Sequence, residues 1–177
     1  MRILVISDTH GDTGNLEYLV RTLGNRLDLL IHLGDGAQDL DRLPEDALRG
    51  IPCMQVKGNM DSDPRLPPSR VTQVRRHLIY VSHGHAALAS GTPLPMILAA
   101  REAGASVCLF GHTHIPQRTR VEGMLVLNPG SLSRPRGGWG PTFALLKVPE
   151  DGVGRIEALH YEIRDPGGRP SLRVVYP

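Results

Sequence analysis

Short groups of histidine, aspartate and asparagine recur at five places in the sequence, each directly after an apolar run. The groups are Asp8-Thr9-His10, Gly34-Asp35, Gly58-Asn59, His83-Gly84-His85 and Gly111-His112-Thr113-His114. Carboxylate, imidazole and amide oxygen together suit divalent metals such as Mn²⁺, Fe²⁺, Zn²⁺ and Ni²⁺. One such group alone is a weak signal, because a polar residue after a strand is ordinarily a turn residue. Five groups of the right type predict a metal site.

The number of these side chains indicates two ions. The expected ligands are Asp8, His10, Asp35, Asn59, His83, His112 and His114. They are too many for one ion with open positions, and Asp35, on the central strand of the first three, is the natural bridge. Two divalent ions, two carboxylates and a bridging hydroxide leave about one net positive charge, which attracts an anion. Two ions about 3.5–4 Å apart can clamp a phosphoryl group and activate water.

The apolar runs before the first three groups must position them. These runs predict strands over 2–7, 28–33 and 51–57, and the stretches between them predict helices over about 12–25 and 39–49. This alternation is typical of a parallel sheet with right-handed crossovers. In open α/β sheets, ligands bind at the carboxyl ends of the strands. The groups are therefore expected to converge on one crevice.

The second half of the chain predicts a different pattern. A hairpin with strands over 71–75 and 78–82 turns near Arg76 and His77, and a helix over 93–103 precedes a buried strand over 106–110. Strands without helices follow, at 117–121, 124–127, 143–148, 156–163 and 172–175. The expected organisation is one domain over 1–177, with two sheets and flanking helices.

As a set, the five groups resemble the motifs of the calcineurin-like metallophosphoesterases. The motifs read DTHG at 8–11, GD at 34–35, GNMD at 58–61, HGH at 83–85 and GHTH at 111–114. The small size, and the segment NPGSLSRPRGG at 128–138, are similar to the compact prokaryotic phosphodiesterase branch of that superfamily.

The resemblance implies a four-layer α/β/β/α sandwich, in which two mixed β-sheets lie face to face between helices, with a di-metal site at the C-terminal strand ends. It implies ligand sets of Asp8, His10, Asp35 and His114 for one ion and of Asp35, Asn59, His83 and His112 for the other. A metal-bridging hydroxide would attack phosphorus, and Asp35, Asn59 and His83 are the expected catalytic residues. Mn²⁺ is the expected metal, with Fe²⁺, Zn²⁺ and Ni²⁺ as alternatives.

One position departs from the family pattern. Many members carry histidine directly after the motif asparagine, where it protonates the leaving group or stabilises the transition state. Here that position is Met60, which cannot carry a proton, and Asp61 lacks the partner that it would orient. The compact branch often lacks this histidine too. Because general acid catalysis contributes about 10²–10⁴-fold, the sequence predicts a preference for good leaving groups.

Four other residues are expected to support the ligands or to face the substrate. They are Asp61, His85, Asn128 and Arg136. His85 either touches the substrate or acts as a substitute acid, or it has a supporting or structural role. Asn128 opens the loop that the resemblance places near the metals, and Arg136 either meets a phosphate or is an ordinary surface charge.

Composition limits the function classes. The chain has 177 residues and a formal net charge of +2, without a long basic cluster, so nucleic acid is neither indicated nor excluded as a partner. No apolar run reaches the ~20 residues of a membrane span. The N-terminal stretch has no cleavage-site pattern, so a cytoplasmic protein is expected. Cys53 and Cys108 lie in apolar runs and are expected to be buried and unpaired.

The sequence therefore favours a metal-dependent phosphodiesterase acting on a small-molecule or nucleotide phosphodiester. A phosphomonoesterase on the same fold is an alternative, disfavoured by the missing acid at Met60. A non-catalytic scaffold is another, because a eukaryotic retromer subunit has this fold. The competent residue at every expected ligand position argues against the scaffold. The resemblance further implies a homo-oligomer, either a dimer or a tetramer.

Overall fold

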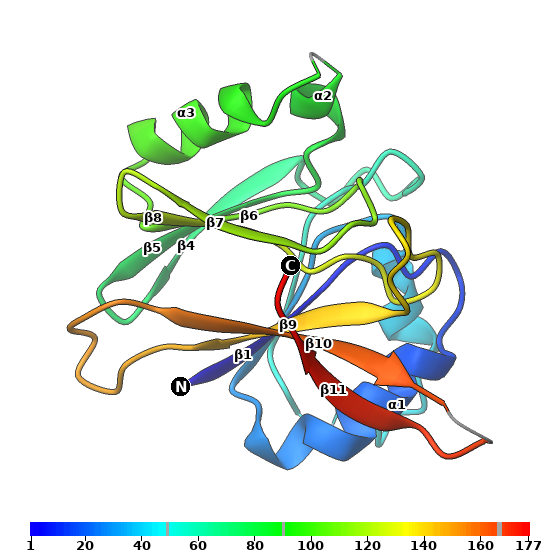
Figure 1. Cartoon of the computed structure of the whole chain (residues 1–177). Coiled ribbons are helices and arrows are strands. Elements are labelled where there is room, and N and C mark those ends of the chain that lie inside the picture. The colour runs from blue at the N-terminus through cyan, green and yellow to red at the C-terminus, as the bar shows by residue number, and fades with distance from the viewer. Residues whose placement is uncertain (49, 90, 166–167) are drawn as a thin grey trace.

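The computed structural model describes residues 1–48, 50–89, 91–165 and 168–177, and contains two β-sheets that lie face to face (Figure 1). The six-stranded sheet has the order β11 (Ser171–Val175), β10 (Glu157–Arg164), β9 (Thr142–Lys147), β1 (Arg2–Ile6), β2 (Leu29–His32), β3 (Cys53–Gln55). The five-stranded sheet has the order β4 (Ser69–Val74), β5 (His77–Ser82), β6 (Val107–Leu109), β8 (Met124–Asn128), β7 (Gln117–Val121).

Both sheets are mixed. In the first, β1, β2 and β3 are parallel, while β9, β10 and β11 join the other side of β1 in antiparallel fashion. In the second, β5, β6 and β8 are parallel, and β4 and β7 are antiparallel edge strands. The predicted parallel arrangement of the first three strands is confirmed, with β2 in the middle.

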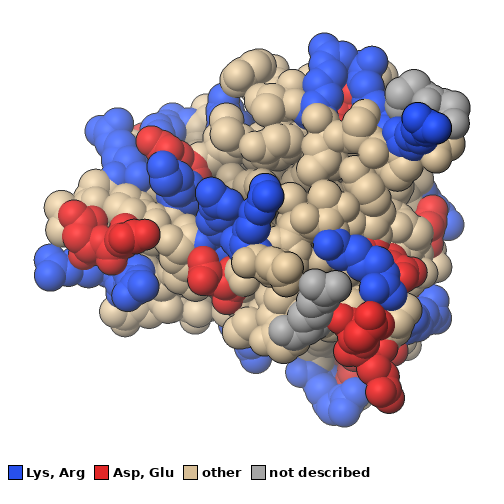
Figure 2. Space-filling model, turned by 90° about the horizontal axis from the view of Figure 1, so that it is seen from below, with Lys and Arg blue, Asp and Glu red and all other residues tan. Residues whose placement is uncertain are grey.

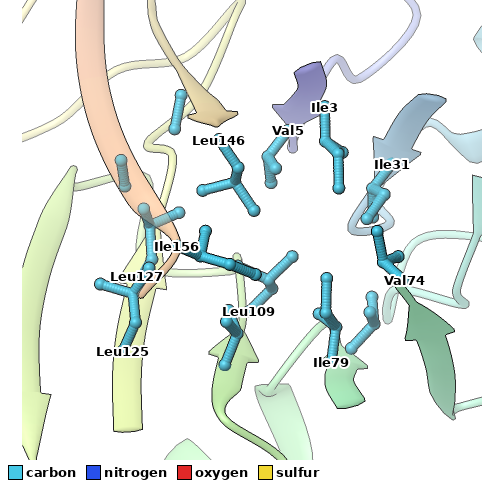
Figure 3. Close-up of a cluster of buried hydrophobic side chains, with 14 of the residues drawn as sticks. Ile3, Val5, Ile31, Val74, Ile79, Leu109, Leu125, Leu127, Leu146 and Ile156 are labelled. Carbon is cyan, nitrogen blue, oxygen red and sulfur yellow. The ribbon is translucent and has the colours of Figure 1, made fainter. Parts of the chain in front are cut away.

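Three hydrophobic clusters separate four layers. Alternate residues of β1 point to opposite faces of the sheet, so Ile3 and Val5 join the cluster between the sheets, whereas Leu4 and Ile6 pack against α1 (Gly14–Leu23). The cluster between the sheets draws side chains from both of them (Figure 3). A third cluster joins α3 (Leu94–Glu102) to the outer face of the five-stranded sheet. The predicted four-layer sandwich is confirmed.

The predicted helix over 39–49 is wrong in kind and length. The structure has a 3₁₀ helix, η2 (Ala37–Arg42), and residue 49 lies outside the described residues. The cause is local: Leu43 precedes Pro44 and is extended, with ψ 151°, because proline disfavours a helical conformation in the residue before it. A second short 3₁₀ helix, η1 (Gly24–Arg26), continues α1.

Two other expectations need correction. Cys53 is exposed, because β3 is the edge strand of its sheet, while Cys108 is buried as expected. The hairpin of β4 and β5 turns at Arg75 and Arg76, one residue earlier than predicted, with Arg75 at φ 56°. The short helix α2 (His85–Leu88) was not predicted from the sequence.

Surface charge is mixed on the face shown in Figure 2, where basic and acidic side chains intermingle. Among the described residues, the helices are all too short or too polar to cross a membrane.

His160 of β10 links the two sheets and provides a test of the packing. Its side chain is fully buried, and its Nε2–H donates to the carbonyl oxygen of Asn128 at 2.7 Å. Burial is the main reason that its pKa falls from 6.5 to about 4. The folded state therefore binds a proton at His160 less readily than the unfolded state does. The contribution of neutral His160 to the free energy of unfolding is fully present above pH 6.5 and declines as the pH falls towards 4.

We expect His160→Gln, which keeps a side-chain N–H but cannot titrate, to flatten this decline. Between pH 7 and pH 4, the wild type should lose about 3 kcal/mol more unfolding free energy than the variant. Urea unfolding of both metal-free proteins, followed by circular dichroism, measures the difference at each pH. Parallel pH profiles for the two proteins would show that His160 is not held neutral by burial.

Candidate metal centre

The loops that follow five strands meet in one place. Asp8 follows β1, Asp35 follows β2, Asn59 follows β3, His83 follows β5 and His112 follows β6. The first three come from one sheet and the last two from the other. Two groups of candidate ligands result, and each combines residues of both sheets: Asp8 with His10 and His114, and Asp35 with His83 and His112.

In the first group, three ligand atoms lie within 4.8 Å of one another. His114 Nε2 is 3.0 Å from Asp8 Oδ1 and 3.2 Å from His10 Nε2. Asp8 is fully buried, and its Oδ1 has no hydrogen-bond partner among the residues that the structure describes. A cation among these atoms would satisfy all three of them, so the group fits a metal ion.

The second group has the same character and adjoins the first. His83 Nε2 lies 3.4 Å from Asp35 Oδ2 and 3.2 Å from Asn59 Oδ1. The rings of His83 and His112 are 5.2 Å apart between centroids. Asp8 Oδ1 of the first group is 4.0 Å from His83 Nε2. The structure therefore brings together all seven residues that the sequence singled out as ligands.

Hydrogen bonds from the far side of the rings fix two of the imidazoles. His83 Nδ1–H donates to the carbonyl oxygen of Leu33 at 2.7 Å, and His114 Nδ1–H donates to that of Arg134 at 2.6 Å. Each bond sets the tautomer, so the Nε2 lone pair points into the centre. Such partners orient metal-binding histidines in known sites.

The backbone of these loops is unusual, because five of the seven residues adopt a left-handed conformation. Their φ values are 57° for Asp8, 48° for His10, 55° for Asp35, 68° for His112 and 61° for His114. Such conformations of non-glycine residues cost about 1–3 kcal/mol each and cluster at functional sites. Backbone hydrogen bonds hold them here: Asp8 N–H donates to Gly34 O, and His10 N–H to Asp35 O, both at 3.0 Å.

Glycine at position 58 is required by the close approach of two loops. A Cβ atom there would overlap the side chain and the backbone nitrogen of Asp35. The glycine before Asn59 therefore allows the third loop to lie directly against the second.

The carboxyl group of Asp35 is held in its ionised form. Burial raises the pKa of Asp35, but hydrogen bonding to His83 and to the backbone N–H of Met60 outweighs it and brings the pKa to about 2. Burial likewise works to lower the pKa of His83, but Asp35 and Asp8 raise it overall. In His10 and His112 burial prevails, and their pKa values are lowered. Ionised carboxylate and neutral imidazole are the forms that bind metal, so a metal ion that binds His83 would displace the proton that Asp35 favours there.

Asp61 joins the second and third loops through four hydrogen bonds from backbone N–H groups. Its Oδ2 accepts from Asp35 at 2.9 Å and from Gly58 at 2.8 Å, and its Oδ1 accepts from Gly36 at 2.8 Å and from Ala37 at 3.1 Å. The carboxylate thus has a full set of partners without the histidine that Met60 replaces. Its contacts hold the backbone on either side of Asp35.

Asn128 also contacts the loops of the centre. It is buried, and its Nδ2 donates to the carbonyl oxygen of Gly111 at 2.7 Å and to Thr113 Oγ1 at 3.0 Å. Its Oδ1 accepts from the N–H of Gly130 at 2.9 Å. Asn128 therefore supports the loop of His112 and His114 from behind.

His85 and Arg136 lie beside the centre in different ways. The His85 ring is 5.6 Å from that of His83 and 6.2 Å from that of His112, measured between centroids. Its buried Nδ1 has no hydrogen-bond partner within the described chain. The Arg136 side chain is exposed, and its backbone N–H donates to the His114 carbonyl oxygen at 3.1 Å.

Sequence reasoning missed Asp39 and Arg42. Asp39 is buried, and its Oδ2 accepts from Thr9 Oγ1 at 2.6 Å and from the N–H of Gly11 at 2.8 Å. Arg42 lines a cleft beside His10. Neither residue belongs to one of the five motifs, and both were assigned to a helix that the structure does not contain. The one feature of the sequence that could have drawn attention to Asp39 is its position four residues after Asp35.

The family model for the calcineurin-like phosphoesterase superfamily domain matches residues 1–151. The chain is 34% identical over 151 residues to the probable metallophosphoesterase YsnB of Bacillus subtilis, covering 85% of this chain and 86% of that protein. It is 26% identical over 170 residues to the phosphodiesterase YfcE of Escherichia coli, covering 82% of this chain and 87% of that protein.

Solved structures agree. A predicted phosphoesterase of Streptococcus pneumoniae matches with a TM-score of 0.75 and 28% identity, over 98% of this chain and 97% of that chain. Wild-type Vps29 of Entamoeba histolytica, solved in complex with zinc, matches with a TM-score of 0.73 and 25% identity, over 99% of this chain and 98% of that chain. By the family model, the relatives and the shared fold, the chain belongs to the calcineurin-like phosphoesterase superfamily.

Proposed function

We propose that this chain is a metal-dependent phosphodiesterase that acts on small-molecule or nucleotide phosphodiesters. The observation that carries the proposal is the pair of adjoining ligand groups, each with its ligand atoms within 4.8 Å of one another. The similarity to YfcE, which is named a phosphodiesterase, supports the reaction class. The proposed ligands are Asp8, His10, Asp35, Asn59, His83, His112 and His114.

The residues of the chain have distinct tasks in this proposal. Two bound divalent ions, foremost Mn²⁺, would supply an activated water and neutralise charge on the phosphoryl oxygens. Asp35 is the proposed bridge, since its carboxylate faces His83 and belongs to the loop that also bonds the His10 backbone. Asn59 is exposed and offers a neutral oxygen on the side open to the substrate. Asp35, Asn59 and His83 are the proposed catalytic residues.

Met60 is 68% exposed, so a change there should not disturb the fold. We expect the wild type to hydrolyse aryl diesters far faster than alkyl diesters, because no group at position 60 protonates the leaving alkoxide. Met60→His should raise kcat/KM for an alkyl diester by about 10²-fold and change that for bis(p-nitrophenyl) phosphate by less than about threefold.

Met60→Gln is the matched control, since glutamine is polar but cannot donate a proton at working pH. It should leave both rates near those of the wild type. The leaving-group hypothesis fails if the wild type turns over alkyl and aryl diesters at similar rates while Met60→His changes neither.

The second candidate function is that of a non-catalytic scaffold, favoured by the similarity to Vps29 over nearly the whole chain. Assay of the purified protein with Mn²⁺ and bis(p-nitrophenyl) phosphate separates the two candidates. A folded protein without metal-dependent hydrolysis would favour the scaffold. A phosphomonoesterase would instead prefer p-nitrophenyl phosphate over the diester.

Three expectations from the sequence stay predictions. They are that residues 1–177 act as a single domain, that the protein is cytoplasmic, and that it forms a dimer or a tetramer. Light scattering coupled to size-exclusion chromatography measures the oligomeric state directly.

A further inference from the structure

A cleft of about 310 Å³ opens beside the first ligand group. It is lined by His10, Asp35 and Met60 of the centre, and also by Arg42 and Arg134. Its volume is at the low end of small-molecule sites, which measure about 300–1,000 Å³. The cleft is therefore large enough for one polar substituent of a substrate whose reacting phosphorus lies at the centre.

Two arginines and three carboxylates line this cleft, and of the carboxylates Asp35 belongs to the proposed metal ligands. Asp61 also lines it, but its carboxylate is occupied by four backbone N–H groups. Asp39 lines it as well, but it is only 2% exposed and accepts from Thr9 and Gly11. Among the described residues around the cleft, Arg42 and Arg134 carry the permanent positive charges. An anionic group would be stabilised there.

Arg42 is positioned by the same aspartate that holds the His10 loop. Asp39 Oδ1 lies 3.2 Å from Arg42 Nη1, while Asp39 Oδ2 accepts from the N–H of Gly11. The guanidinium lies over Gly11, since a Cβ atom at that residue would be 3.4 Å from Nη1. The Arg42 side chain is nevertheless 61% exposed. It is thus anchored at one nitrogen next to His10, and it lines the cleft.

Arg134 is anchored through its backbone. Its carbonyl oxygen accepts from His114 Nδ1–H at 2.6 Å, and its N–H donates to Ser131 Oγ at 2.9 Å. Because Ser131 Oγ also donates to the carbonyl oxygen of Asp8, the segment is tied to the first ligand group. Arginine suits phosphate in particular, because its fork donates two parallel hydrogen bonds.

We propose that Arg42 and Arg134 bind a second phosphate of the substrate in this cleft, so that the preferred substrates are phosphodiesters that carry a further phosphate monoester. The inference rests on the proposed function, because it places the scissile diester at the adjoining metal centre. The second phosphate is held by the cleft and takes no part in bond cleavage.

Binding tests the inference without turnover. Thymidine 3′,5′-bisphosphate and thymidine 5′-monophosphate are titrated calorimetrically into the Mn²⁺-loaded protein. We expect the bisphosphate to bind about tenfold more tightly, as two charge-assisted contacts would give. Arg42→Gln combined with Arg134→Gln should reduce this advantage to less than about twofold. Arg155→Gln combined with Arg169→Gln, two exposed arginines that do not line the cleft, is the charge-matched control and should keep it.

Two results of this comparison of nucleotides would overturn the inference. One is equal affinity of the wild type for the two nucleotides, and the other is an advantage that survives in the double variant. Decathymidylate is titrated in the same way, because the neighbouring phosphate in the cleft could also come from a nucleic-acid strand. If this oligonucleotide binds more than about tenfold tighter than the bisphosphate, with a steep salt dependence, the arginines belong to a nucleic-acid groove and the small-substrate inference is wrong.

Kinetics separates this inference from the proposed function. The substrates are the 5′-(p-nitrophenyl phosphate) of thymidine with and without a 3′-phosphate, which share one leaving group. We expect about tenfold higher kcat/KM with the 3′-phosphate in the wild type and none of this gain in the double variant. Hydrolysis without such a preference would overturn the proposed second-phosphate site and leave the proposed phosphodiesterase function standing. No hydrolysis, together with the tenfold binding advantage, would support phosphate binding by the two arginines but would overturn the phosphodiesterase and, with it, the inferred substrate class.

Discussion

Asp35→Asn should lower kcat/KM for bis(p-nitrophenyl) phosphate by about 10³-fold or more, because the centre loses the carboxylate proposed to bridge its two ions. Asparagine has nearly the same size, and its oxygen can still accept the N–H of Met60, which lies 2.8 Å from Asp35 Oδ1. The substitution removes the negative charge and little else. Steady-state kinetics, metal content by plasma emission and circular dichroism measure activity, metal binding and fold.

Asp46→Asn is the matched control for this substitution. Asp46 pairs with Arg21 at 3.2 Å on the surface, and its side chain is 69% exposed. Loss of such a pair has little effect on stability and should leave hydrolysis unchanged. A folded Asp35→Asn protein with wild-type rates would contradict the bridging role.

Asp61→Asn should weaken both the fold and the binding of metal. Four backbone N–H groups converge on the carboxylate, and an amide would turn an N–H₂ group towards two of them. Buried donors left without a partner cost about 1–3 kcal/mol each, so for two donors we expect a loss of about 2–6 kcal/mol of unfolding free energy. Urea unfolding of the metal-free protein measures that loss.

A dependence on Mn²⁺ distinguishes positioning by Asp61 from direct ligation. Loss of the contacts that orient ligands typically lowers metal affinity about 10–100-fold. Excess Mn²⁺ should therefore restore much of the activity of Asp61→Asn, whereas Asp35→Asn should stay inactive at any concentration. An Asp61→Asn protein with wild-type stability and wild-type Mn²⁺ dependence would show that the four hydrogen bonds have no such role.

The ligand groups could be predicted from the sequence because their chemistry is local. Asp8, Asp35 and His83 each follow a recognisable apolar run, and parallel strands bring such ends to one edge of a sheet. The continuous apolar run in β1 likewise predicted a strand that is covered on both faces, and the structure buries four of its five residues. These features depend on residues that are close in sequence, so the sequence pattern alone can indicate them.

The features that could not be predicted depend on contacts between distant segments. Asp61 bonds the N–H of Asp35, which is 26 positions away, and no spacing rule identifies that pairing. The exposure of Cys53 depends on β3 being an edge strand, which only the complete strand order reveals. Arg42 lies over Gly11 at the end of a short 3₁₀ helix, which stops before Pro44 instead of continuing as the expected helix.

Titration of the metal-free protein with Mn²⁺ tests whether this chain is a two-metal phosphodiesterase, when bound metal and hydrolysis of bis(p-nitrophenyl) phosphate are followed together. We expect no hydrolysis without metal and a rise to full activity as the second ion per chain is bound, since the two ligand groups adjoin. A folded chain that binds no Mn²⁺, or that binds two ions and hydrolyses no diester, would contradict the two-metal phosphodiesterase.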